Sequence, residues 1–205
     1  MRASRNRLMA ILAITAALAA GVTVSGCGPG VSHGESSSSG EAMVGGPFQL
    51  VDQDGKTVDQ RLLDGKWSAV FFGYTYCPDV CPTTLQILAQ ARAKLGDRGN
   101  ALQVVFVSVD PDRDTPAQMK SYLATPSFPQ PTIGLTGSAA QVAAAAKEYR
   151  VYYAKQGTGG GYAMAHSSLV YLMNPQGKFD SVLSESQTPD QVATQIGDAM
   201  RKAPG

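Results

Sequence analysis

Cysteine, histidine and tryptophan are scarce in this 205-residue sequence, which contains three, two and one of them. An excess of either charge is also missing, since 17 lysines and arginines oppose 16 aspartates and glutamates. Three of the arginines lie in residues 1–26, which hold no acid, so the formal charge falls from +1 to −2 when that stretch is removed. A chain without a basic patch lacks the electrostatic footprint of a nucleic-acid-binding protein, and we exclude nucleic acid as a partner.

Long apolar runs are scarce as well. The N-terminal apolar stretch, residues 8–24, is rich in alanine and only seventeen residues long, at the lower limit for a span of about 17–25 residues. Three arginines precede it and the small residues of 24–27 (V-S-G-C) follow it, which is the pattern of a secretory signal. The ending resembles a bacterial lipoprotein box. We therefore expect residues 1–26 to be a lipoprotein signal peptide and Cys27 to be lipidated; the alternative is an uncleaved anchor.

Both interpretations place the rest of the chain on the extracytoplasmic side of a bacterial inner membrane, where thiols tend to oxidise. Residues 27–46 are expected to hold the lipidated Cys27 and a flexible linker dominated by glycine and serine. We interpret His33 as a solvated histidine of this linker. The remaining residues, 47–203, have the length of one domain and can bury a substantial core.

Strand and helix patterns alternate along this domain. Continuous or turn-bounded apolar runs predict strands at 47–51, 67–74, 102–109, 168–173 and 179–183, the last two joined as a hairpin. Helical spacing or a Ser/Thr-x-x-Gln capping box predicts helices at 82–95, after Thr115, from Ser138 to about Tyr149 and from Thr188 to about Lys202. This order predicts an α/β fold with a sheet layered between helices.

Two of the three cysteines, Cys77 and Cys81, lie four residues apart between the predicted strand 67–74 and the predicted helix 82–95. Residues at i and i+4 share a helix face, so we expect both sulfurs to point at one spot. The Cα atoms would then be roughly 6 Å apart, which a disulfide accepts. Such a pair can act as a redox-active dithiol, as a disulfide or as two soft metal ligands. A purely structural disulfide is disfavoured, because so short a loop removes little unfolded-state entropy.

The position of this pair favours a thioredoxin-like domain, although the spacing is C-x-x-x-C rather than C-x-x-C. Outside the linker the chain has a single histidine, His166, 85 residues after Cys81. Two thiolates and an imidazole suit copper, especially Cu(I), whereas zinc normally takes a fourth ligand. From spacing alone, an ordinary core or surface histidine is the default interpretation of His166.

Several motifs occur in a specific order: G-P-F at 46–48, F-G-Y-T-Y-C-P-D-V-C-P at 72–82, S-V-D-P-D-R-D-T-P at 108–116, G-L-T-G at 134–137 and H-S-S at 166–168. On these motifs, residues 47–184 resemble the Sco/SenC family of copper-binding, thioredoxin-like proteins. The resemblance implies a thioredoxin-like central mixed sheet flanked by helices, with an N-terminal strand extension. It also implies that Cys77, Cys81 and His166 bind a copper ion, as Cu(I), Cu(II) or both.

The same resemblance implies a membrane-tethered metallochaperone that delivers copper to the binuclear copper site of cytochrome c oxidase during assembly. Its partners would be the oxidase subunit with that site, a copper donor and a thiol reductant, because a Cys77–Cys81 disulfide has no thiolates to offer. Two alternatives stay open: a thiol–disulfide oxidoreductase that maintains the oxidase cysteines, and a redox or copper sensor on the same fold. His166 separates delivery from dithiol exchange, which needs no imidazole.

Two positions depart from the family pattern. The residue before the histidine is usually acidic in the family and is Ala165 here, and the position before the first cysteine, often histidine, is Tyr76. Neither change removes a ligand. The missing acid puts the control of the imidazole's orientation in doubt.

For the charged residues in these motifs, the sequence leaves two alternatives open: a structural role within their own loop, or a role at the site. Asp79 and Asp110 either face the site or serve a turn or cap. Arg113 either forms a loop ion-pair network with Asp112 and Asp114 or docks a partner.

Two features close to the histidine are also open to both interpretations. Met164 would share a strand face with His166, as an auxiliary soft ligand or as a core residue. Residues 157–161 are either a plain hairpin tip or a mobile loop that lets His166 engage and release metal.

Overall fold

The computed structural model describes residues 44–202. The expected signal peptide, Cys27 and His33 lie outside the described residues, as does the expected linker up to residue 43. Val44 packs against the core, and Gly45 donates its backbone N–H to the Glu148 carbonyl oxygen at 2.9 Å. Between residues 44 and 202, no helix is both long and apolar enough to cross a membrane.

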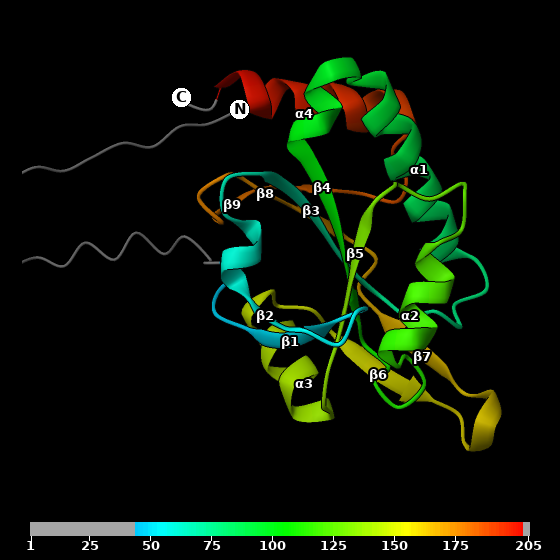
Figure 1. Ribbon diagram of the computed structural model, residues 1–205. Helices are drawn as coiled ribbons and strands as arrows, with labels where there is room; N and C mark the ends of the chain where they lie inside the picture. The colour runs from blue at the N-terminus through cyan, green and yellow to red at the C-terminus, as the bar shows by residue number, and fades with distance from the viewer. Residues whose placement is uncertain (1–43, 203–205) are drawn as a thin grey trace, which may run out of the picture. The chain divides into compact units, whose positions relative to one another are not determined.

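A seven-stranded mixed sheet forms the centre of the domain, in the order β2-β1-β5-β4-β3-β8-β9 (Figure 1). Neighbouring strands β3, β4 and β5 are parallel, and the outer strands pair antiparallel. The strands are β1 (Gln49–Asp52), β2 (Thr57–Asp59), β3 (Trp67–Gly73), β4 (Leu102–Ser108), β5 (Thr132–Thr136), β8 (Val170–Met173) and β9 (Phe179–Leu183). The antiparallel pair β1–β2 extends the sheet beyond β5, as the predicted N-terminal strand extension requires.

A second, two-stranded sheet consists of β6 (Tyr153–Gln156) and β7 (Ala163–His166). This hairpin projects from the rest of the fold at the lower right of Figure 1. Its strands pair in the register Tyr153 with His166 and Gln156 with Ala163. Residues 157–162 connect the strands and include a 3₁₀ turn at Gly159–Gly161, so the glycine-rich segment is the hairpin tip.

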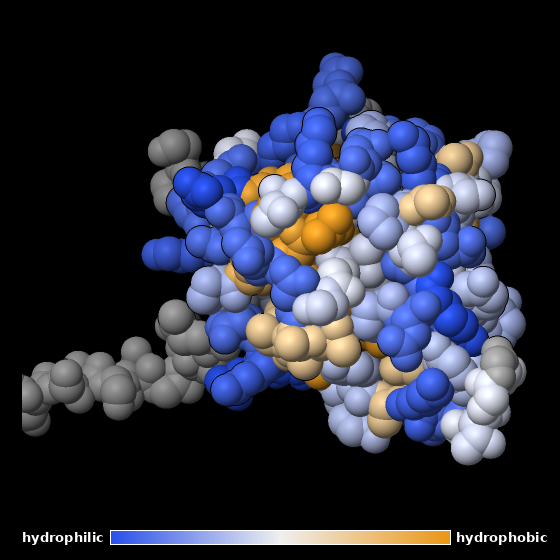
Figure 2. All heavy atoms as spheres, turned by 60° about the horizontal axis from the view of Figure 1, so that its bottom comes forward, coloured by the Kyte–Doolittle hydropathy of each residue, from blue (hydrophilic) through white to orange (hydrophobic). Residues whose placement is uncertain are grey.

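Four α-helices cover the large sheet: α1 (Val80–Lys94), α2 (Pro116–Leu123), α3 (Ala139–Glu148) and α4 (Pro189–Lys202). Short 3₁₀ helices, η1 (Gln60–Leu63) and η2 (Gly96–Ala101), complete the connections. Helices α1, α2 and α4 lie on one face, and α3 lies on the other (Figure 1). Figure 2, which looks at the side at the bottom of Figure 1, shows mostly hydrophilic side chains around a smaller apolar patch.

The alternation of side chains along β3, β4 and β5 determines which helix packs on which face. Phe71 and Phe106 contact edge to face, with ring centroids 5.8 Å apart, on the side of α1 and α2. On the same side, a Cβ atom at Gly134 would lie 2.5 Å from Leu123 of α2, so only glycine lets this helix approach. The opposite side packs Val105 and Val107 against α3.

Most of the expected elements are present with the expected types. Helix α1 begins at Val80, two residues before its expected start, and β2, β5, β6 and β7 were not among the expected strands. The Ser138 and Thr188 capping boxes both form. Thr115 caps α2, but the side chain of Gln118 does not complete a box and instead donates to Thr75 Oγ1 at 3.2 Å. The predicted central mixed sheet flanked by helices is confirmed.

Candidate metal centre

The two motif cysteines do not lie on one helix, contrary to the expectation from their spacing. Cys77 precedes α1 in a turn, where its backbone N–H donates to the Tyr74 carbonyl oxygen at 3.2 Å. Pro78 explains this, because a residue before proline is disfavoured in the helical region. Cys81 lies in the first turn of α1, and its N–H donates to Cys77 Sγ at 3.4 Å. The loop therefore brings the thiols together by a different route from the one predicted.

Cys81 fits its position because β3 ends in a glycine. A Cβ atom at Gly73 would lie 2.8 Å from Cys81 Sγ and 2.8 Å from the ring of Phe106. Glycine at this position lets the sulfur approach the end of the central strand, where Cys81 is fully buried. Cys77 is half-buried, and no disulfide joins it to Cys81.

His166 reaches the cysteines from the end of β7. Its Nε2 atom lies 3.7 Å from Cys81 Sγ, and the donor atoms of Cys77, Cys81 and His166 all lie within 4.8 Å of one another. Two sulfurs and one nitrogen at such distances can close around a soft metal ion with small side-chain movements. This donor set fits copper better than a hard cation such as magnesium, which prefers oxygen.

The tautomer of His166 is determined by its neighbour in the chain. Its Nδ1 atom lies 3.0 Å from the Ser167 carbonyl oxygen. A carbonyl only accepts hydrogen bonds, so Nδ1 carries a proton, and in the neutral ring Nε2 then presents its lone pair toward the cysteines. The ring also packs edge to face against Tyr74, with centroids 5.7 Å apart at 90°.

The two thiols share one proton unequally. A hydrogen bond from the Cys81 thiol is the main cause that holds the pKa of Cys77 well below that of an ordinary thiol, and two backbone N–H groups act in the same direction against burial. The same bond, together with desolvation, raises the pKa of Cys81. At neutral pH the pair is therefore a thiolate at half-buried Cys77 beside a thiol at Cys81.

The buried carboxylate of Asp114 anchors the cysteine loop, residues 74–79, at Thr75. Asp114 is fully buried and accepts hydrogen bonds from the Thr75 N–H at 3.1 Å, the Thr75 hydroxyl at 2.6 Å and the Ser108 hydroxyl at 2.6 Å. Burial raises the pKa of Asp114, and its three donors oppose that rise. In one of the two interpretations from the sequence, Asp114 belongs to an ion-pair network with Arg113; its contact with Thr75, 39 residues away, corrects that interpretation.

Arg113 pairs instead with Asp110, which is also buried. The Asp110 carboxylate accepts a second bond from the Tyr162 hydroxyl at 2.6 Å. Asp110 therefore has a local role, whereas Asp112 is exposed. Asp79 accepts from the Thr83 hydroxyl at 3.4 Å and makes no side-chain cap to α1.

An open hollow of about 340 Å³ is lined by two of the three donors, Cys77 and His166. Met164 lines it and also packs against the core, so the side chain contributes both to the core and to the wall of the site. Two exposed carboxylates, Asp79 and Glu185, line the same hollow. Glu185, in the connection between β9 and α4, was not singled out from the sequence because no local motif links it to the cysteines.

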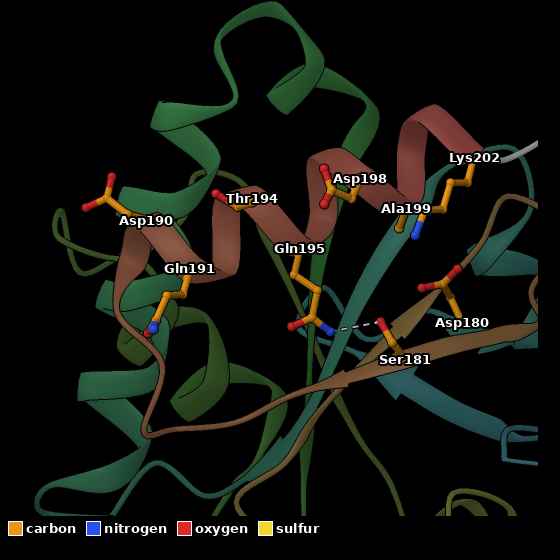
Figure 3. Close-up of a pocket in the computed structure, with 9 residues that line it drawn as sticks. All are labelled: Asp180, Ser181, Asp190, Gln191, Thr194, Gln195, Asp198, Ala199 and Lys202. Carbon is orange, nitrogen blue, oxygen red and sulfur yellow. Dashed lines mark hydrogen bonds between the residues drawn. The ribbon is translucent and has the colours of Figure 1, made fainter.

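A larger groove of about 580 Å³ lies elsewhere, between β9 and α4 (Figure 3). Its walls are polar, and Gln195 donates to the Ser181 hydroxyl at 3.1 Å across it. Two of its aspartates already have cationic partners, Asp190 with Lys94 and Asp198 with Arg201. None of the three soft donors lines this groove, so we assign no chemistry to it.

Comparison with known proteins agrees with this geometry. Residues 36–201 match the family model described as SCO1/SenC. The chain belongs to the SCO1/SenC family.

Among its relatives, SCO1 homolog 1, mitochondrial, of Arabidopsis thaliana is 39% identical over 170 residues, which are 82% of this chain and 50% of the relative. This chain thus spans about half the length of that protein. Protein SenC of Rhodobacter capsulatus is 41% identical over 162 residues, 78% of this chain and 72% of the relative. The structure of Bradyrhizobium japonicum ScoI with copper bound has a TM-score of 0.69 at 44% identity, and covers 76% of this chain and 98% of that one. The likeness confirms the predicted thioredoxin-like fold.

In this SCO1/SenC member, Ala165 stands where the motif resemblance led us to expect an acidic residue. Ala165 has no polar side chain to orient the imidazole, but the Ser167 carbonyl already holds Nδ1. Tyr76, at the other departure, is 54% exposed and lies near the guanidinium of Arg113, whose Cζ atom is 4.7 Å from the ring centroid.

Proposed function

We propose that this chain binds one copper ion through Cys77, Cys81 and His166 and delivers it to the binuclear copper site of cytochrome c oxidase during assembly. The observation that carries the proposal is the convergence of two sulfurs and one imidazole nitrogen within 4.8 Å. The Nδ1 atom of that imidazole bonds the Ser167 carbonyl, which leaves Nε2 to face the sulfurs. The copper found in the Bradyrhizobium ScoI structure supports the choice of metal. The step to oxidase assembly rests on the family resemblance.

Copper is cargo in this proposal, and the chain's own residues prepare the site for it. Cys77 is half-buried beside the open hollow, whereas Cys81 is fully buried. An incoming soft donor from a partner therefore meets Cys77 first, and ligand exchange proceeds from that side. A Cys77–Cys81 disulfide must first take up two electrons from a thiol reductant, together with the one proton that Cys81 keeps at neutral pH, because only the reduced pair offers two sulfur ligands.

We further propose that the mature chain is held at the outer side of a bacterial inner membrane by lipid on Cys27. The support is the order of arginines, apolar stretch and V-S-G-C at residues 24–27. The site would then work next to a membrane-bound acceptor. The Gly/Ser-rich segment up to residue 43 would give it reach.

Thiol–disulfide exchange is a second candidate, and one observation favours it. Cys77 is the more accessible thiol and has a lowered pKa, which are the properties of an attacking thiolate. His166 distinguishes the two functions, because thiol–disulfide exchange with a partner uses the Cys77–Cys81 pair and does not need the imidazole as a ligand.

The test is complementation of a strain that lacks this protein, under limiting copper. We expect His166→Ala to retain a reversible Cys77–Cys81 disulfide but to lose oxidase assembly, and Cys77→Ser to lose both. Full assembly with His166→Ala, together with failure of the cysteine variant, would instead make dithiol exchange the physiological activity.

A further inference from the structure

The hairpin that carries His166 is separate from the main sheet. Strands β6 and β7 pair with each other in their own two-stranded sheet. The cysteines, in contrast, are attached to β3 and α1. Besides the contact of the His166 ring with Tyr74, the position of the third donor relative to the other two therefore depends on contacts between the hairpin and the loop that carries the cysteines.

One arginine makes such contacts on both sides. The Arg113 Cζ atom lies 3.7 Å from the ring centroid of Tyr162, which leads into β7, and 4.7 Å from that of Tyr76, which precedes Cys77. Its Nη1 atom also donates to the Tyr162 carbonyl oxygen at 3.0 Å. A planar guanidinium can stack on aromatic rings and still donate in its own plane, which lysine cannot reproduce.

The surroundings hold the guanidinium in that place. The Arg113 side chain is 15% exposed and its ion-pair partner Asp110 is 3% exposed. Asp110 also accepts from the Tyr162 hydroxyl at 2.6 Å, so one carboxylate fixes both the cation and the ring. The Nη2 atom is buried without a hydrogen-bond partner, as expected of a group that lies among aromatic rings.

We propose that Arg113 is a positioning residue that holds the His166 hairpin over the cysteine loop by stacking between Tyr162 and Tyr76. Arg113 acts through two tyrosines: Tyr76, which is next to Cys77 in the sequence, and Tyr162, which lies four residues before His166. The consequence for metal binding rests on the proposed function, whereas the consequence for the hairpin does not.

The test compares Tyr162→Leu with Tyr162→Phe in the reduced apo domain. Both variants lose the hydroxyl bond to Asp110, but only phenylalanine keeps a ring for Arg113. We expect amides of residues 153–166 to exchange hydrogen about tenfold faster in the leucine variant than in the phenylalanine variant, without a change in β3 and β4. Cu(I) affinity, measured by competition with a chromophoric chelator, should fall about tenfold in the leucine variant only.

Two further variants complete the design. Tyr152→Leu is the matched control, because this tyrosine is 66% exposed at the base of β6, and it should behave as wild type. Arg113→Lys keeps a cation for Asp110 but loses the stack, and it should repeat the effect of Tyr162→Leu even if the leucine variant folds poorly.

Equal exchange and equal affinity in the leucine and phenylalanine variants would overturn the positioning role, as would an equal loss in Tyr152→Leu. A wild-type domain that takes up no copper would instead refute the proposed function. The exchange comparison would still decide the role of Arg113.

Discussion

The Nδ1 atom of His166 lies 3.0 Å from the carbonyl oxygen of Ser167, the next residue in the chain. This contact leaves Nε2 as the atom that faces Cys81, at 3.7 Å from its sulfur. The histidine is therefore prepared for a metal by local backbone geometry and not by a neighbouring acid. A second partner for the imidazole of a metal site is common, and a backbone carbonyl serves this purpose as well as a carboxylate does.

The first prediction concerns this tautomer. At a pH where the imidazole is neutral, we expect His166 of the apo domain to carry its proton on Nδ1, because only a donor can satisfy the Ser167 carbonyl. Long-range ¹H–¹⁵N correlation spectra distinguish the two forms directly. A neutral ring protonated on Nε2 would show that the nitrogen facing Cys81 is not free to bind metal.

The second prediction concerns the anchor of the cysteine loop. Asp114→Ala should lower the free energy of unfolding by about 2–3 kcal/mol, because it leaves the buried Thr75 and Ser108 donors without an acceptor. Asp112→Ala is the control, since Asp112 is exposed and a surface change of this kind costs less than about 0.5 kcal/mol. Denaturant unfolding measures the free energy of unfolding of both variants. If Asp114→Ala were as stable as Asp112→Ala, Asp114 would not anchor the cysteine loop.

How far the sequence predicts this fold depends on how local each signal is. The strands β3 and β4 are runs of seven mostly buried residues, and their pattern is clear without tertiary information. Strand β5 has five residues with a glycine in the middle, so its run is too short to stand out. Its glycine is required by the approach of Leu123, which no local pattern reveals.

The site, too, has local features that the sequence predicts and distant contacts that it does not. Spacing alone pairs Cys77 with Cys81, although the proline between them puts Cys77 before the helix and not on it. His166 lies 85 residues from Cys81, and only the family resemblance connected them. The bond from Thr75 to Asp114 spans 39 residues and depends on the loops that follow β3 and β4, whose adjacency in the sheet is a tertiary property.

The third prediction follows from the unequal thiols. The pKa of Cys77 is lowered chiefly by the hydrogen bond from Cys81, so Cys77 should remain a thiolate at pH 6, where an ordinary thiol of pKa about 8.5 is less than 1% ionised. Iodoacetamide should therefore modify the reduced domain at Cys77 with a rate that changes little between pH 6 and pH 8.

Cys81→Ala removes the donor and should raise the pKa of Cys77, which slows its modification at pH 6 and leaves the rate at pH 9 nearly unchanged. Peptide mass spectrometry identifies the modified residue. Modification that drops about tenfold per pH unit in the wild-type domain, as for a free cysteine, would refute the shared-proton arrangement.

The fourth prediction concerns attachment to the membrane. Cys27→Ser should abolish labelling by a radioactive or clickable fatty acid and leave an unprocessed precursor, because Cys27 is the cysteine of the V-S-G-C sequence. Cys77→Ser is the control and should be labelled normally. Unchanged labelling of the Cys27 variant, or a mature N-terminus elsewhere, would show that residues 8–27 are not a lipoprotein signal.

The most direct test of the central claim is the copper content of the reduced domain, residues 44–205, after anaerobic loading with Cu(I) and gel filtration. The three converging donors predict one copper per chain, lost in Cys77→Ser and in Cys81→Ser because too few soft ligands remain. A reduced wild-type domain that emerges without copper would contradict the account.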